Sequence, residues 1–151
     1  MAMIEKSIEV DVPVTTAYNQ WTQFEEFPRF MEGVEEVRQL DDRHLHWVAT
    51  VGGKRKEWEA EVTEQIPDER IAWTARGGDV NAGVVTFHRL NDDETRVMLQ
   101  MAYEPEGIVE GAGSALGFVT RRVEGDLKRF KEFIETRGVE TGAWRGSVSQ
   151  H

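Results

Sequence analysis

The sequence predicts an α+β protein in which one antiparallel sheet of seven strands packs a single face against one long C-terminal helix. Two observations predict this fold. Six segments of alternating apolar and polar residues follow one another between residues 34 and 105, and short turn-forming joins separate them. From residue 115 the alternation gives way to an apolar stripe at helical spacing. A sheet with one such helix buries one face beneath it and leaves the other exposed.

The composition is that of one globular domain. The chain has 151 residues, of which 39% are hydrophobic and 30% charged. Its net charge of -10 disfavours a nucleic-acid partner, because phosphate binding depends on lysine and arginine. The absence of cysteine excludes disulfides, thiolate catalysis and cysteine-ligated metals. No signal-peptide pattern and no run of ~20 apolar residues is present, so we expect a cytoplasmic protein without integral membrane association.

The N-terminal third predicts one strand and two short helices. Residues 3–13 alternate as a half-buried strand, although Lys6 interrupts the apolar positions. Residues 14–21 place apolar side chains at helical spacing. Pro28 prevents a simple continuation of that helix. A second short helical turn is therefore expected around Pro28, ended by Gly33.

The predicted meander places large and small side chains on one inner face. Its strands are expected at residues 34–40, 44–51, 57–66, 70–76, 83–90 and 95–105. Period-two alternation assigns three tryptophans to the inner face, together with a phenylalanine, a methionine and a tyrosine. Ala49, Ala60, Ala75 and Gly83 share that face. Such a mixture either leaves a void beneath the helix or interdigitates to fill it.

The C-terminal helix and the segment after it differ in periodicity. The apolar stripe of the helix consists of Leu116, Val123, Leu127, Phe130 and Ile134, and its basic residues mostly lie away from that stripe. Gly138 is the expected C-cap. Residues 138–151 have no periodicity and are expected to form a flexible tail, so the single domain is assigned to residues 1–137.

Three stretches together resemble a known family. They are WTQFEEFPRFMEGVEEV, GGKRKEWEAEVTEQIPDERIAW and GVVTFHRLNDDETRVMLQMAYEPEG. Over residues 3–136 the chain resembles the polyketide cyclase/dehydrase branch of the START-like (SRPBCC) superfamily, which includes coenzyme-Q-binding START-domain proteins and the birch-pollen-allergen fold. The resemblance implies a helix-grip fold. In that fold a curved sheet grips the C-terminal helix around a deep apolar cavity, and the two short helices close one end.

The same resemblance and the inner-face pattern give a set of candidate ligand-binding residues. They are Phe27, Phe30, Met31, Trp47, Trp58, Trp73, Phe87, Met101, Tyr103 and Phe118. The resemblance implies that the residues around Pro28 line the narrow wall of the cavity, with Phe24 nearer the core. It also implies that the glycine-rich stretch 111–117 forms a gate.

The leading functional hypothesis is non-catalytic binding or carriage of an apolar small molecule, such as a lipid, an isoprenoid quinone or a polyketide-like aromatic. No cofactor, metal or catalytic residue is predicted, and the chain is expected to be a monomer or homodimer. The first alternative is a polyketide cyclase or dehydratase. Cyclases of this superfamily usually carry an arginine inside the cavity where this sequence has Val62, which leaves Tyr103 and Arg89 as candidates. The second alternative is a protein- or ribosome-interaction module, like some toxin-like relatives.

Three other motifs are interpreted as structural. His44 and His46 share one strand face, but no carboxylate pattern completes a metal site around them. The alternating glutamates at residues 57, 59 and 61 indicate a solvated strand face. The stretch GAGSALG lacks the Gly-Lys-Ser/Thr ending of a phosphate-binding loop.

Overall fold

The computed structural model describes residues 2–51, 53–76, 80–103 and 112–148. The elements follow the predicted order: one strand, two short helices, six strands and one long helix. They are β1 (Ala2–Val10), α1 (Val14–Trp21), the 3-10 helix η1 (Phe24–Arg29), β2 (Val34–Gln39), β3 (His44–Val51), β4 (Lys54–Ile66), β5 (Arg70–Arg76), β6 (Val80–Asn91), β7 (Glu94–Tyr103) and α2 (Ala112–Arg137).

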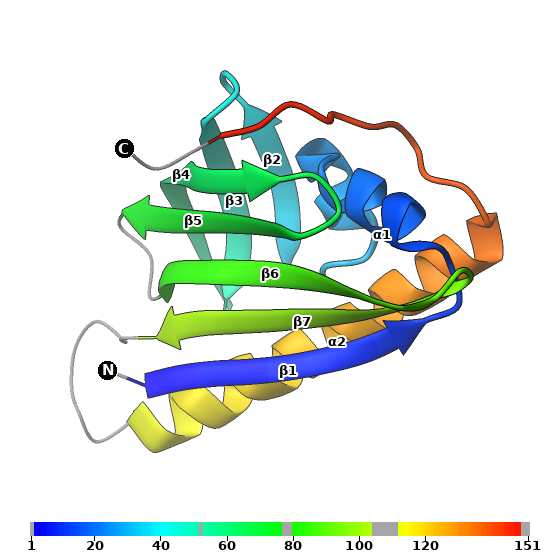
Figure 1. The fold of residues 1–151 in the computed structure, drawn as a ribbon. Coiled ribbons are helices and arrows are strands. Elements are labelled where there is room, and N and C mark those ends of the chain that lie inside the picture. The colour runs from blue at the N-terminus through cyan, green and yellow to red at the C-terminus, as the bar shows by residue number, and fades with distance from the viewer. Residues whose placement is uncertain (1, 52, 77–79, 104–111, 149–151) are drawn as a thin grey trace.

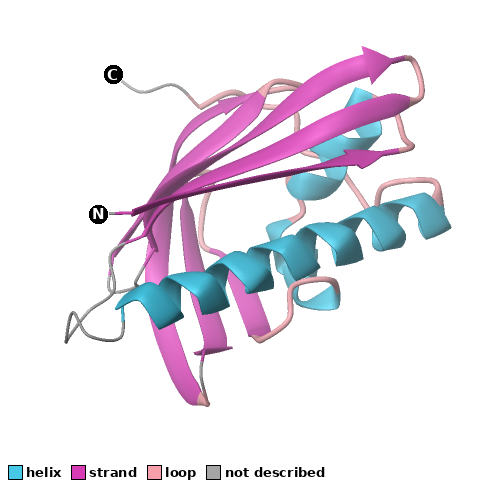
Figure 2. Ribbon diagram, turned by 90° about the horizontal axis from the view of Figure 1, so that it is seen from below, coloured by secondary structure: helices cyan, strands magenta, loops and turns pink. Residues whose placement is uncertain are grey.

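The seven strands form one antiparallel sheet in the order β1-β7-β6-β5-β4-β3-β2. Each strand from β2 to β6 pairs with the next strand in the chain, and β1 pairs with β7 at the other edge of the sheet, with Ala2 opposite Tyr103. The sheet curls, and α2 runs along its concave side (Figures 1 and 2). The α+β helix-grip architecture expected from the sequence is therefore confirmed.

Two strands begin earlier than the sequence predicted. β4 begins at Lys54 and β6 at Val80, each three residues before the expected start. The basic residues Lys54, Arg55 and Lys56 therefore belong to β4. They pair with the end of β3, where Thr50 lies opposite Arg55. A positive φ of 81° at Gly53 makes the tight turn possible.

The core forms where α2 and α1 meet the sheet. The α2 side chains of Val123, Leu127, Phe130 and Ile134 are all buried, as the apolar stripe predicted. Phe130 packs edge-on against Trp21 of α1, with ring centroids 4.9 Å apart. Lys6, which interrupts the apolar face of β1, forms an ion pair with Glu124 of α2 at 3.6 Å.

Glycines end two of the helical segments as the sequence predicted. Gly138 has a φ of 74°, and its N–H donates to the carbonyl of Ile134 at 2.9 Å, which caps α2. Gly33 has a φ of 83° and follows η1, whose interior contains Pro28. No helix in the described part of the chain is long and apolar enough to cross a membrane.

The segment after α2 differs from the expected flexible tail. Residues 138–148 run back past α1 to β4 (Figure 1), where Val148 and Gln65 exchange two backbone hydrogen bonds of 2.7 and 3.0 Å. Arg145 forms an ion pair with Asp68 at 2.9 Å, and Trp144 packs against the core. Residues 138–148 therefore make contacts with distant segments of the chain. Residues 149–151 lie outside the described part.

Candidate functional site

A cavity of about 220 Å³ lies between the concave face of the sheet and α2. Its walls come from α1, η1, the central strands, β7 and the middle of α2. The apolar side chains that line it include Trp21, Phe24, Phe27, Met31, Val34, Leu45, Trp47, Ala49, Trp58, Ala60, Val62, Ile71, Trp73, Ala75, Leu99, Met101, Val119, Val123 and Leu127. Of the two readings of the mixed inner face, the structure shows the one with a void.

Small residues on the central strands keep this space open. Ala49, Ala60 and Ala75 all lie in the cavity wall, where larger side chains would fill the volume. Gly83 of β6 pairs with Trp73 of β5, and the indole lies directly over the glycine. A Cβ atom added at Gly83 would lie 2.4 Å from Cζ2 of Trp73. The glycine therefore lets this indole lie against the sheet.

A stacked pair of indoles forms one wall of the cavity. Trp47 of β3 and Trp58 of β4 are direct cross-strand partners, with ring centroids 5.7 Å apart and planes only 9° from parallel. Phe27 of η1 contacts the same Trp47 ring at 5.6 Å. Nε1 of Trp47 is buried and has no hydrogen-bond partner among the described residues. A buried donor without a partner costs free energy.

The charged residues in the described lining of the cavity come together where the end of η1 meets α2. They are Glu32, Arg122 and Asp126. The backbone N–H of Glu32 donates to Oδ1 of Asp126 at 3.0 Å, and Nη1 of Arg122 donates to the carbonyl of Glu32 at 2.8 Å. Arg129 completes the group with a 2.5 Å contact from its Nη2 to Asp126. The cavity is therefore apolar along its length and polar at this end.

Asp126 is the most buried acid of this group, with its side chain 18% exposed. Burial raises the pKa of its carboxyl, while the hydrogen bonds from Arg129 and the Glu32 N–H act in the opposite direction. Burial is the larger effect. The cavity thus contains a carboxyl group that is protonated more readily than an ordinary aspartate.

The structure places six of the ten predicted ligand-binding residues in the cavity wall. These six are Phe27, Met31, Trp47, Trp58, Trp73 and Met101. Phe30 and Phe87 instead belong to the core: Phe30 packs on Phe130 at 5.2 Å and Phe87 on Tyr18 at 5.4 Å. Phe118 is 37% exposed and is not among the residues that line the cavity. The side chain of Tyr103 lies outside the described part of the structure. The same holds for the side chains of residues 111–116, which form most of the glycine-rich stretch 111–117.

Several residues that line the cavity were not predicted from the sequence. Phe24 was expected nearer the core but lines the cavity, as does Trp21. Arg122 was grouped with the basic residues expected to lie mostly away from the apolar stripe, and Asp126 was given no role. They lie three and seven residues after Val119, so they share its row on the helix surface, and this spacing was the available signal. Val62, at the position of the cyclase arginine, does line the cavity.

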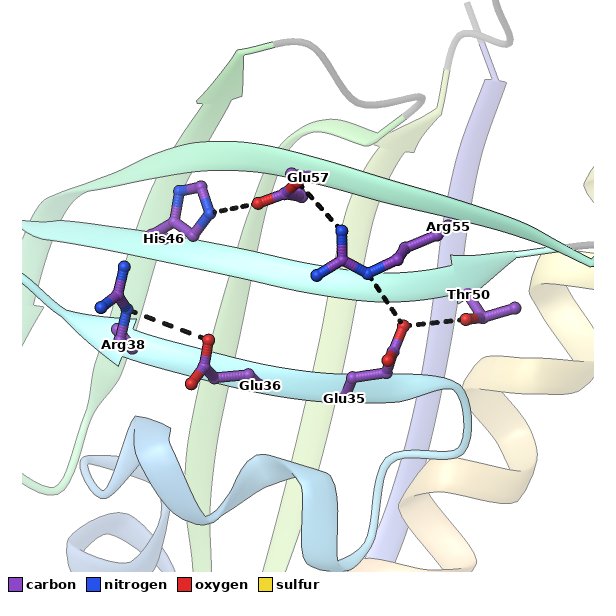
Figure 3. Close-up of polar contacts among 7 residues, drawn as sticks. All are labelled: Glu35, Glu36, Arg38, His46, Thr50, Arg55 and Glu57. Atoms are coloured by element: carbon purple, nitrogen blue, oxygen red, sulfur yellow. Dashed lines mark hydrogen bonds and ion pairs between the residues drawn. The ribbon is translucent and has the colours of Figure 1, made fainter.

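The outer face of β2, β3 and β4 carries a surface network of polar contacts (Figure 3). Nε2 of His46 lies 3.1 Å from Glu57, which also accepts from Arg55 at 3.2 Å. The hydrogen bond from His46 and the charge of Arg55 lower the pKa of Glu57. A bulge near Val34 turns Glu35 outward as well, and Glu35 accepts from Thr50 at 3.0 Å.

This network does not form a metal site. His44 contacts Asp41 at 2.9 Å, away from the His46–Glu57 pair. No group of three or more histidines or carboxylates in the described residues is arranged to hold an ion. Arg89, a candidate for the cyclase alternative, is an exposed residue of β6 that pairs with Asp92.

Comparison with known proteins gives both close and remote relatives. The chain is 62% identical over 149 residues to an uncharacterized 17.2 kDa protein in the melC2-rnhH intergenic region of Streptomyces lincolnensis, covering 98% of this chain and 99% of that one. The fold matches the Zhui aromatase/cyclase from Streptomyces sp. R1128, with a TM-score of 0.79, 16% identity, and coverage of 95% and 99% of the two chains.

A START superfamily protein from Mycobacterium smegmatis also shares the fold, with a TM-score of 0.73, 15% identity, and coverage of 87% of this chain and 98% of that one. The family model described as "Polyketide cyclase / dehydrase and lipid transport" matches residues 10–132. This match spans most of the chain and includes β3 to β7 and nearly all of α2. The chain therefore belongs to the polyketide cyclase/dehydrase and lipid transport family.

Proposed function

We propose that this protein binds and carries a compact apolar small molecule, of aromatic character, in the cavity beneath α2. The observation that carries the proposal is an apolar cavity of about 220 Å³ whose wall contains the stacked indoles of Trp47 and Trp58. A cavity of this kind would be costly if it served packing alone, because voids destabilise a fold. An apolar ligand that fills the void would compensate for this cost.

The size of the cavity favours the smaller of the ligand classes that the sequence left open. Engineered apolar cavities of about 150 Å³ hold a benzene ring, so this cavity suits a molecule of one or two fused rings. An isoprenoid quinone or a long-chain lipid exceeds this volume and would fit only in part. A two-ring aromatic buries about 250 Å² of surface, which favours binding by on the order of 6 kcal/mol before the cost of association.

Titration with 2-naphthol tests the proposal, because this molecule has two fused rings and one hydroxyl oxygen. Four of the five tryptophans line the cavity, so their fluorescence reports binding there. Ala60→Leu extends a side chain into the cavity and should weaken binding at least about tenfold by occluding it. Ala143→Leu adds the same atoms on the exposed segment after α2 and should leave the affinity unchanged.

Mass spectrometry of a solvent extract from the gently purified protein identifies any ligand retained from the cell. The proposal predicts a stoichiometric apolar compound in the native sample and none after heat denaturation. An empty extract together with no binding of 2-naphthol would contradict the proposal. Equal affinity in the wild type and in Ala60→Leu would move the binding site out of this cavity.

Asp126 supports a second candidate function, a cyclase or dehydratase. A buried carboxyl with a raised pKa at the polar end of the cavity can donate a proton to the leaving hydroxyl of a β-hydroxy ketone, which departs as water, and the carboxylate so formed can accept the α-proton as the carbon–carbon double bond forms. This function predicts turnover of an aromatic-precursor β-hydroxy ketone that Asp126→Asn abolishes while binding persists. Binding without turnover in the wild type leaves the carrier role.

A further inference from the structure

We infer that the ligand carries a carboxylate, held outside the apolar cavity by Arg121 and Arg122. This inference rests on the proposed function and specifies the chemistry of the ligand. It starts from a second hollow, of about 180 Å³, lined by Glu32, Phe118, Arg121, Arg122, Gly125 and Arg129.

The two hollows adjoin each other. Glu32 and Arg122 line both of them, so the guanidinium of Arg122 lies at the boundary between the apolar interior and the outer hollow. A single molecule can therefore place its rings in the cavity and a substituent in the outer hollow. The substituent meets three arginines and one glutamate among the described lining residues.

The three arginines are not equally available to a ligand. Arg129 is already paired, because its guanidinium contacts Asp126 at 2.5 Å and Glu32 at 3.5 Å. Arg122 donates to a backbone carbonyl, which leaves most of its five N–H donors unused by that bond. Arg121 is exposed and forms no ion pair within the described part of the chain. Arg121 and Arg122 therefore remain to bind an anion, and a planar guanidinium matches a carboxylate in two parallel hydrogen bonds.

The surroundings of Arg122 hold its guanidinium in place before any ligand arrives. The ring of Phe118 lies 5.0 Å from the guanidinium carbon, which accounts for an aromatic side chain on the exposed side of α2. Gly33 provides the space on the opposite side: a Cβ atom there would lie 2.3 Å from Nη1 of Arg122. A site fixed in this way loses little side-chain entropy when it binds.

The overall negative charge of the protein restricts where a carboxylate ligand can bind. A chain with a net charge of -10 repels anions over most of its surface. A carboxylate ligand is retained only where arginines outnumber nearby acids, as they do in the outer hollow. The ligand class is therefore a compact aromatic carboxylic acid, and its neutral ester should bind less well.

A matched pair of probes, 2-naphthoate and methyl 2-naphthoate, tests this inference by calorimetry and tryptophan fluorescence. Hydrogen bonds to charged groups contribute about 1.5–3 kcal/mol, so the acid should bind the wild type at least ~10-fold more tightly than the ester. Arg121→Gln/Arg122→Gln should remove this preference. Lys128→Gln removes one positive charge from the same helix outside both hollows and should retain the preference.

Arg121→Gln alone serves as the second variant, because Arg121 is exposed and its loss does not threaten the fold. It should reduce the preference for the acid by a part of the full effect. Equal affinity of acid and ester in the wild type, or a preference that survives in the double variant, would overturn the inference while the proposed function stands. If 2-naphthol binds the wild type but neither of these probes does, the inference fails and the proposed function stands. If none of the three binds and the solvent extract is empty, the inference and the proposed function fail together.

Discussion

At the scale of single residues, the pairing of Gly83 with Trp73 controls how much of the cavity is open. Gly83→Ala places a methyl group 2.4 Å from the present position of the Trp73 ring, so the indole must tilt into the cavity. We expect a loss of stability of about 1–3 kcal/mol from overpacking, and at least tenfold weaker binding of 2-naphthol. Urea denaturation and fluorescence titration measure the two effects.

Gly117→Ala is the control for this prediction. A Cβ atom at Gly117 makes only an ordinary contact, 3.7 Å from Arg121, and the residue lies within α2. Replacing glycine by alanine in a helix should stabilise the protein by up to about 1 kcal/mol. If Gly83→Ala behaves like Gly117→Ala, the ring of Trp73 does not depend on the glycine.

Asp126 should make stability depend on pH. Its pKa is raised in the folded state, so the unfolded chain releases this proton first as the pH rises. The contribution of Asp126 is therefore fully present below the ordinary aspartate pKa of about 3.9 and is lost as the pH rises through the raised value. Asp126→Asn does not titrate, and its amide oxygen can still accept from the N–H of Glu32.

The free energy of unfolding of Asp126→Asn should consequently rise relative to wild type between about pH 4 and pH 7. Urea denaturation across this range measures the difference. A difference that stays constant, or that changes in favour of the wild type, would show that the contacts with Arg129 outweigh burial.

Particular residues show what the sequence could predict about the site. Alternation on the strands placed Trp47, Trp58 and Trp73 correctly, because side-chain direction in a sheet follows from the period of two. The same rule placed Phe87 on the inner face but could not say that α1 covers that end of the sheet. The position of Arg122 was predicted wrongly, because the prediction relied on its charge rather than on the row of the helix surface that it occupies.

At the scale of elements, the segment after α2 is held by a few contacts that a point variant can remove. The side chain of Trp144 packs against the core, and its backbone N–H donates to Oγ1 of Thr22 at 3.1 Å. Trp144→Ala should lower the free energy of unfolding by about 2 kcal/mol, less than the 3–5 kcal/mol typical of a fully buried tryptophan. Chemical denaturation gives this value directly.

Ser147→Ala, at an exposed position of the same segment, should change stability by less than about 0.5 kcal/mol. An equally small effect of Trp144→Ala would support the flexible tail that aperiodicity predicted. Aperiodicity could not reveal the docking, because the partners of this segment are Gln65, Asp68 and residues of α1 and the turn after it, which are distant in the sequence.

The strands and hairpins were predictable because their signals are local. Turn residues separate each pair of strands, and alternation identifies the strands themselves. The starts of β4 and β6 were placed three residues late, since Lys54 and Arg55 continue the ladder without any apolar residue to mark it. Pairing with the preceding strand determines where these strands begin.

At the scale of the whole molecule, a ligand in the cavity joins the sheet to α2 and should stabilise the entire fold. Binding to the folded state alone adds about 2.7 kcal/mol at a ligand concentration of 100 times Kd. For a chain of this length that corresponds to a rise of roughly 5–10 °C in Tm. Calorimetry with saturating 2-naphthol measures the shift, and Ala60→Leu should show little of it. A rise that is equally large in that variant would point to binding elsewhere.

The pairing of β1 with β7 also sets an order in time. Among the described strands, β1 is synthesised before the others and pairs only with β7, which lies roughly 100 residues later; at about 5–20 residues per second this partner follows on the order of 5 to 20 seconds behind. β2 to β7 can meanwhile assemble hairpin by hairpin. Until β7 is made, the charges of Glu5, Lys6 and Glu9 disfavour pairing of β1 with other nascent chains. The cavity comes into existence last, when α2 leaves the ribosome, so a ligand can take no part in the earlier steps of biosynthesis.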